Sequence, residues 1–171
     1  MKKFLFIFGI VIVIAGAAGY LFWQDYKSGV VSGRVEQMGT EMPDEGQGHI
    51  PVGSEHKPYS TNPPTSGPHY EQPAAWGVYD HELVDEQLVH NLEHGGIWIS
   101  YKDIDTETKA KIEDLGKRYP QAVIVTPRPK NNAKIVLASW RRMLEMDVFD
   151  RDTVVEFITR NKNKSPEPLA N

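Results

Sequence analysis

A run of twenty apolar residues, 4 to 23, constrains this 171-residue chain more than any other feature. It reads FLFIFGIVIVIAGAAGYLFW and carries no charge. As a helix it would span about 30 Å, the thickness of the hydrocarbon core of a bilayer. Lys2 and Lys3 precede the run and Trp23 ends it, which favours a cytoplasmic N-terminus. The sequence therefore predicts a transmembrane anchor over residues 1–24, in the cell membrane, with the rest of the chain outside the cytoplasm.

A cleaved signal peptide is the alternative interpretation of the same run. Ala15-Gly16-Ala17 resembles a small-residue cleavage site after a short apolar region. The apolar run nevertheless continues to Trp23, which a signal peptide does not require, so we favour the anchor. Both interpretations place residues 25–171 outside the cytoplasm.

The composition of the remaining chain excludes several kinds of site. It has no cysteine, and therefore no disulfide and no thiolate metal ligand. Beyond residue 24 lie 17 of the 19 basic and all 23 acidic residues, a formal charge of −6, which argues against nucleic-acid binding. The length suffices for a single core. We expect a juxtamembrane stalk over 25–48, an extracytoplasmic domain over 49–165 and a polar tail over 166–171.

Residues 43–80 hold seven of the twelve prolines, which exclude long helices and central strands there. The same segment contains four aromatic residues, and disordered linkers are usually poor in these. We expect a long, ordered, proline-rich loop that packs onto the domain. Ordered loops of this length are often functional.

Regular structure is predicted beyond residue 81. Asp80 and Asp105 are suited to cap helices, while Gly95 and Pro120 are suited to end them. The apolar patterns predict helices over 82–94, 105–119 and 150–160, and strands over 97–101, 122–126 and 135–140. This order indicates an α+β fold, a small sheet with helices packed on one side.

All six histidines lie between residues 49 and 94. The sharpest motif is His90-Asn91-Leu92-Glu93-His94, because histidines four residues apart on a helix lie about 6 Å apart and can chelate one ion. In an extended strand they would lie about 13 Å apart, too far for that. His56 and His81 stand in polar surroundings, so we expect them at the surface.

Three other motifs leave alternatives open. His90, Glu93 and His94 satisfy the HxxEH pattern of inverted zinc peptidases, in which the glutamate is the general base. Met38 and Met42 with His49 would suit copper(I). Ser66 could be a nucleophile in principle, but Ser-Gly-Pro is ordinary turn chemistry.

Three blocks of sequence resemble a bacterial domain-of-unknown-function family, the one numbered 3105. They are Pro63-Pro64-Thr65-Ser66-Gly67-Pro68-His69, Trp76-Gly77-Val78-Tyr79-Asp80 and Val89-His90-Asn91-Leu92-Glu93-His94-Gly95-Gly96. The resemblance runs from about His49 to Pro168. It implies a short N-terminal membrane segment and motif positions at His49, His69, His90 and His94, but no established reaction.

The leading hypothesis is a membrane-anchored domain that binds a transition metal, copper or zinc. The expected ligands are His49, His69, His90 and His94, with Glu93 as a fifth ligand or as an acceptor that orients a ligand ring. A role in metal handling or delivery is favoured over catalysis. The alternatives are a metal-dependent hydrolase built on the HxxEH motif and a metal-free interaction domain of the cell envelope. The sequence identifies no protein partner.

Overall fold

A six-stranded mixed sheet forms the centre of the computed structural model, which describes residues 36–170. Its strands are β1 (Thr40–Glu41), β4 (Gly77–Val78), β5 (Ile97–Tyr101), β6 (Val123–Pro127), β7 (Ile135–Ser139) and β8 (Arg142–Met146). They lie in the order β1-β8-β7-β5-β6-β4. β4, β5 and β6 run parallel, whereas β7 is antiparallel to β5 and β8, and β1 is antiparallel to β8.

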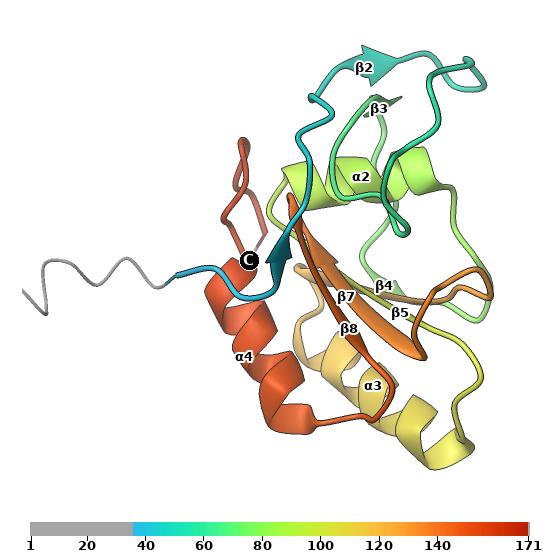
Figure 1. Cartoon of the computed structure of the whole chain (residues 1–171), viewed down its shortest axis with the longest axis vertical. Helices are drawn as coiled ribbons and strands as arrows, with labels where there is room; N and C mark the ends of the chain where they lie inside the picture. The colour runs from blue at the N-terminus through green and yellow to red at the C-terminus, as the bar shows by residue number, and fades with distance from the viewer. Residues whose placement is uncertain (1–35, 171) are drawn as a thin grey trace, which may run out of the picture. The chain divides into compact units, whose positions relative to one another are not determined.

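Three helices cover this sheet, and they cover both of its faces (Figure 1). α3 (Thr106–Arg118) and α4 (Arg151–Asn161) pack on one face through Ile112, Leu115 and Phe157, among others. α2 (Asp85–Glu93) packs on the other through Leu88 and Leu92. The expectation of helices on one side only is therefore wrong.

The physical reason lies in the strands themselves. Along β5, Ile97 and Ile99 enter the core under α3 and α4, while Trp98 enters the core under α2. All residues of β5 and β7 are buried. A strand that is apolar on both faces requires a cover on each side.

Most of the predicted elements are confirmed to within a few residues. β5 has the predicted bounds. α3 and α4 are capped by Asp105 and Asp150, whose side chains accept hydrogen bonds from the backbone amides of Thr108 and Thr153. α2 departs from the prediction. It begins after Val84, without a side-chain cap, and Asp80 instead contacts the ring of His81 at 2.8 Å.

Three strands of the main sheet, β8, β1 and β4, were not predicted from the sequence, and β4 has only two residues. β8 reads RMLEM, a mixture of charged and long side chains that resembles helix as much as strand, and its residues are only partly covered. β1 has two residues, too few for a pattern.

β1 lies in the segment expected as a stalk, yet residues 37–170 belong to one compact unit. Met38 packs against the core, and the side chain of Asn161 bonds both its backbone groups.

The proline-rich segment carries a second, two-stranded sheet. β2 (His49–Ile50) and β3 (His69–Tyr70) pair in parallel, and β3 lies against α2 (Figure 1). Tyr59, Ala74 and Trp76 from the same segment pack into the apolar cluster between α2 and the main sheet. The segment thus forms the outer layer over α2.

The expected membrane anchor, residues 4–23, lies outside the described residues. Within residues 36–170, no helix is both long enough and apolar enough to cross a bilayer.

Candidate metal centre

The last turn of α2 directs three polar side chains away from the main sheet. Leu88, Val89 and Leu92 are fully buried and hold one face of the helix against the sheet. With 3.6 residues per turn, His90, Glu93 and His94 fall on a different face. This face meets β3, where the Tyr70 carbonyl accepts a hydrogen bond from His90 Nδ1 at 2.6 Å.

The helix ends immediately after these side chains. The amide of Gly96 bonds the carbonyl of Asn91, and the amide of Gly95 bonds the carbonyl of Leu92. Gly95 has a φ of +82°. This is the Schellman arrangement, in which a left-handed glycine closes the helix. The predicted end of the helix at Gly95 is confirmed.

The small parallel sheet brings two more histidines to the same place. In its register His49 lies beside His69. Aligned residues of neighbouring strands point to the same face of a sheet, so both rings face α2. Backbone bonds fix the register, since the amides of Gly67 and His69 donate to the carbonyls of Gly46 and Gly48.

The rings of His49, His69 and His90 form a tight triad. Their centroids are separated by 4.8 Å (His49–His69), 5.1 Å (His49–His90) and 5.0 Å (His69–His90). One nitrogen from each ring lies within 4.8 Å of the others, a spacing that a metal ion can bridge. The structure therefore brings together three of the four histidines expected as ligands in a group compatible with a metal ion.

Glu93 lies against this triad and is almost completely buried, with 2% of its side chain exposed. Its Oε2 is 2.9 Å from His69 Nε2 and 3.8 Å from His49 Nε2. Among the described residues it makes no ion pair with lysine or arginine. A buried carboxyl group needs a compensating proton or charge, so Glu93 requires a proton shared with a histidine or a cation beside it.

The hydrogen bonds of His69 lead to the same requirement. Its Nδ1 lies 2.8 Å from the carbonyl of Gly67, which only accepts, so Nδ1 carries a proton. Neutral His69 would then have a lone pair on Nε2, facing the carboxylate of Glu93. Two acceptors cannot share a contact of 2.9 Å without a proton or a cation between them.

His94 completes the set beside His90. Their Nε2 atoms are 2.6 Å apart and their rings are stacked at 4.5 Å. Because His90 donates from Nδ1, its Nε2 offers a lone pair toward His94. His94 Nδ1 is buried and has no hydrogen-bond partner among the described residues. Burial lowers the pKa of His90; the bond to the Tyr70 carbonyl opposes this, but nearby His94, His69 and His49 lower it further, which favours the neutral ring that metals bind.

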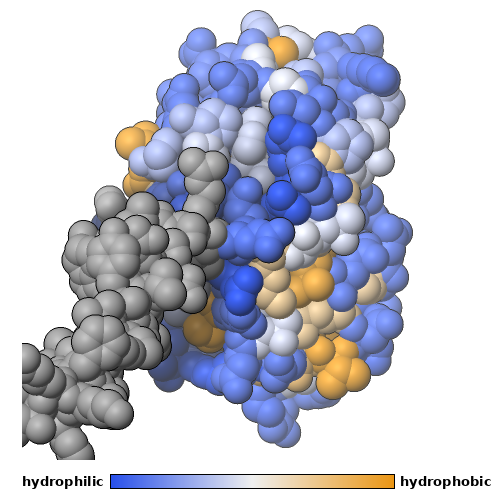
Figure 2. Space-filling view, turned by 60° about the vertical axis from the view of Figure 1, so that its left-hand side comes forward, coloured by the Kyte–Doolittle hydropathy of each residue, from blue (hydrophilic) through white to orange (hydrophobic). Residues whose placement is uncertain are grey.

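His49 connects the cluster to solvent. Its side chain is 44% exposed, whereas His69 is completely buried. On the face seen in Figure 2, the upper part of the molecule, where β2 and β3 lie in Figure 1, is mostly hydrophilic. Among the three histidines of the triad, His49 is thus the exposed one.

Two other residues singled out in the sequence, Met38 and Ser66, lie outside the histidine cluster. Met38 packs into the core beneath α3 and α4, on the far face of the sheet from α2. Ser66 is buried, accepting from the amide of Glu45 and donating to the carbonyl of Pro43. Both are explained by packing and loop structure.

The two histidines expected at the surface differ from each other. His81 is exposed. His56 was expected there too, but only 13% of its side chain is exposed, because Nε2 contacts Glu86 at 3.0 Å and Nδ1 bonds the carbonyl of Lys57. The Glu86 contact raises the pKa of His56, although partial burial opposes it.

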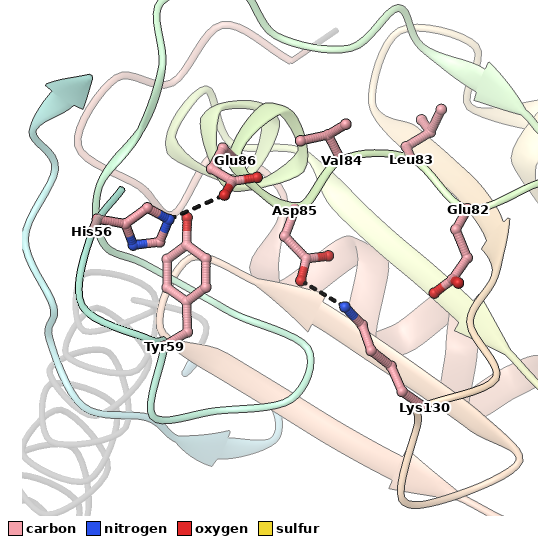
Figure 3. A pocket seen from close by; sticks show the side chains of 8 residues that line it. All are labelled: His56, Tyr59, Glu82, Leu83, Val84, Asp85, Glu86 and Lys130. Carbon is pink, nitrogen blue, oxygen red and sulfur yellow. Dashed lines mark hydrogen bonds and ion pairs between the residues drawn. The ribbon is translucent and has the colours of Figure 1, made fainter. Parts of the chain in front are cut away.

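A pocket of about 360 Å³ lies beside His56 at the opposite end of α2 (Figure 3). His56 and Tyr59 line one side of it, and Glu82 and Lys130 line the other. Asp85, which also lines the pocket, forms ion pairs with Lys130 and with buried Arg128. No member of the histidine cluster lines this pocket.

Comparison with known proteins identifies a family but no relative of known activity. No curated protein matches the chain, and no solved structure matches it. A family model, described as a protein of unknown function (DUF3105), matches residues 52–171. The match includes His69, His90, Glu93 and His94 and begins after His49. Because it spans well over half of the chain, this protein belongs to the DUF3105 family.

Proposed function

We propose that this domain binds one divalent transition-metal ion, copper(II) or zinc, at the cluster of His49, His69, His90, His94 and Glu93. The observation that carries the proposal is the triad of imidazoles whose nitrogens lie within 4.8 Å, with a buried carboxylate against it. Imidazole and carboxylate are common ligands of zinc, and imidazole suits copper(II).

A metal ion is one way to meet the requirement for a proton or a cation at Glu93 and His69. A dication near Glu93 would supply the missing positive charge and separate the two acceptors at Glu93 and His69. Two nitrogens on a tetrahedral zinc with bonds of 2.0–2.1 Å lie about 3.3 Å apart. The Nε2 atoms of His90 and His94 are 2.6 Å apart, so these stacked rings would open by about 0.7 Å around an ion.

A binding or delivery role fits this donor set better than hydrolysis. Catalytic zinc sites use three protein ligands and keep one position for water or substrate, whereas four histidines and a carboxylate could fill the coordination shell. Glu93, the general base in the peptidase interpretation, is directed at His69 and His49.

The test is metal analysis of the full chain, purified in detergent without a histidine tag or chelators. We expect about one tightly bound copper or zinc ion per chain. The double variant His90→Ala/His94→Ala should lose it, whereas His81→Ala, an exposed histidine outside the cluster, should keep it. A wild-type protein that neither retains nor takes up either ion would overturn the proposal.

We further propose that the domain works outside the cytoplasm, anchored through residues 4–23. The support is the uncharged apolar run and its basic N-terminal flank. Because the chain has no cysteine, single cysteines can report the topology. A membrane-impermeant maleimide should label Val52→Cys, at a site 79% exposed, in spheroplasts with intact membranes, and Lys2→Cys only after permeabilisation. The reverse pattern would contradict this orientation.

A further inference from the structure

The segment after α4 returns to the end of α2 that carries the candidate ligands. The amide of Asn163 bonds the carbonyl of Gly95 at 2.9 Å, and the amide of Glu167 bonds that of Glu93 at 3.2 Å. The amides of Leu169 and Ala170 both bond the carbonyl of His94, at 2.9 and 3.0 Å. The last carbonyls of a helix have no partner within the helix. Here residues 163–170 supply partners for the carbonyls of Glu93, His94 and Gly95.

Asn163 closes this segment into a ring. Its Nδ2 donates to the carbonyl of Ala170 at 2.6 Å, and its Oδ1 accepts from the amide of Ala170 at 3.0 Å. Asn163 has a φ of +59°, a conformation that asparagine tolerates better than most residues. Ala170 is only 2% exposed. The polar tail expected over 166–171 is thus held in place as far as Ala170.

The contact between this ring and the end of α2 is too close for a side chain at Gly95. A Cβ built on Gly95 would lie 2.5 Å from Asn163 Oδ1 and 2.7 Å from Asn163 Cα. Asn163 therefore packs directly against Gly95, the glycine that ends the helix. The ring and the last turn of α2 form one packed unit.

We propose that Asn163 is a positioning residue for the metal centre. Through the ring of residues 163–170 it fixes the backbone of Glu93 and His94, and with it the positions of their side chains. This inference rests on the proposed metal-binding function. Ligands must be held to within about 0.5 Å, and loss of groups that orient them typically weakens metal binding by 10- to 100-fold.

The test compares two asparagines of the full chain with similar bonds. Asn163→Ala removes the paired bonds to Ala170. Asn161→Ala removes paired bonds of the same kind to the backbone of Met38, which packs with the core on the other face of the sheet. Both variants should lower the melting temperature of the metal-free protein. Only Asn163→Ala should weaken copper(II) binding, by at least 10-fold, and change the paramagnetic resonance spectrum of the bound copper(II).

A second variant covers the case in which Asn163→Ala does not fold. Asn163→Gly also removes the paired side-chain bonds to Ala170 but suits the φ of +59° at this position, so it should fold and show the same loss of affinity. Wild-type affinity and spectrum in a folded Asn163 variant would overturn the positioning role alone. Equal loss of affinity in Asn163→Ala and Asn161→Ala would also overturn it, since the effect would then follow stability. Absence of metal binding in the wild type would overturn the proposed function itself.

Discussion

At the scale of single residues, the cluster is governed by the charge of Glu93. Every other member is an imidazole, so this buried carboxylate is the negative charge closest to the triad. Its Oε2 atom is 2.9 Å from Nε2 of His69 and 3.8 Å from Nε2 of His49. The electrostatics of the cluster therefore depend on one side chain.

Replacement of that charge gives a direct prediction. Glu93→Gln should weaken binding of copper(II) or zinc by about 10- to 100-fold, because the amide keeps the shape and loses the charge. Glu86→Gln, on the same helix and one turn before His90, should leave the affinity unchanged. Isothermal titration with a competing chelator measures both. Equal affinities in the two variants would remove Glu93 from the site.

A second residue-level prediction concerns the ion pair beneath the pocket. Burial by itself would raise the pKa of Asp85, but hydrogen bonds and charge from Arg128 and Lys130 outweigh it and leave the pKa below its usual value. A carboxyl group with a lowered pKa in the folded state stabilises the fold above its unfolded pKa, near 4, and loses this contribution as the pH falls through the folded value.

Asp85→Asn should therefore cost about 3 kcal/mol at pH 7, since it leaves the guanidinium of Arg128, which is 3% exposed, without its carboxylate. The difference from wild type should shrink as the pH falls below about 4. Urea unfolding of the metal-free protein at several pH values measures it. Glu55→Gln, at an exposed position, is the control and should cost little at any pH. A difference that does not change with pH would contradict the ion-pair explanation.

At the scale of elements, the last turn of α2 and the residues just after it have three structural roles. They end the helix, carry the candidate ligands His90, Glu93 and His94, and receive the segment after α4. Gly95 makes the first and the last possible, because its positive φ turns the chain and its missing side chain admits Asn163.

Gly95→Ala should therefore destabilise the fold more than a positive φ alone requires. Gly53 is the matched control, with a φ of +81° and no atom within 4 Å of a built Cβ, against +82° and contacts of 2.5–3.0 Å at Gly95. Gly53→Ala should cost about 1 kcal/mol of unfolding free energy, from backbone strain only. Gly95→Ala should cost at least about 2 kcal/mol more. Similar costs in chemical unfolding would show that the contact with Asn163 relaxes easily.

At the scale of the whole molecule, the candidate site lies between two layers, the small sheet of β2 and β3 and the helix α2. β2 and β3 have two residues each and carry His49 and His69, while α2 packs on the main sheet. An ion held by both layers would bind only the folded protein. Binding to the native state alone stabilises it by about 2.7 kcal/mol at a free concentration of 100 times Kd.

Thermal unfolding should reveal this linkage. Copper(II) or zinc should raise the melting temperature of the full chain, and a chelator should reverse the rise. Magnesium and calcium should have no effect, because these ions prefer oxygen ligands. The increase should fall in His49→Ala and persist in His81→Ala. A chelator-insensitive melting temperature at saturating metal would favour a metal-free interaction domain.

The sequence by itself determined the features that depend on neighbours along the chain. Asp105 and Asp150 cap their helices because each side chain reaches the backbone amide three residues further along the chain. Gly95 ends α2 because glycine takes a positive φ readily. The i, i+4 spacing of His90 and His94 places them on one face of a helix. β8 was missed because its sequence, RMLEM, mixes charged and apolar side chains without strict alternation.

Only the tertiary structure decided what joins distant segments. His49 meets His69 through a parallel register fixed by backbone bonds, and both meet α2 because β3 packs against it. Residues 163–170 reach Glu93 and His94 across some seventy residues of chain. Spacing rules hold within one helix or strand, where geometry is periodic. Between elements, the position of a side chain follows from packing of the whole core, which no local pattern encodes.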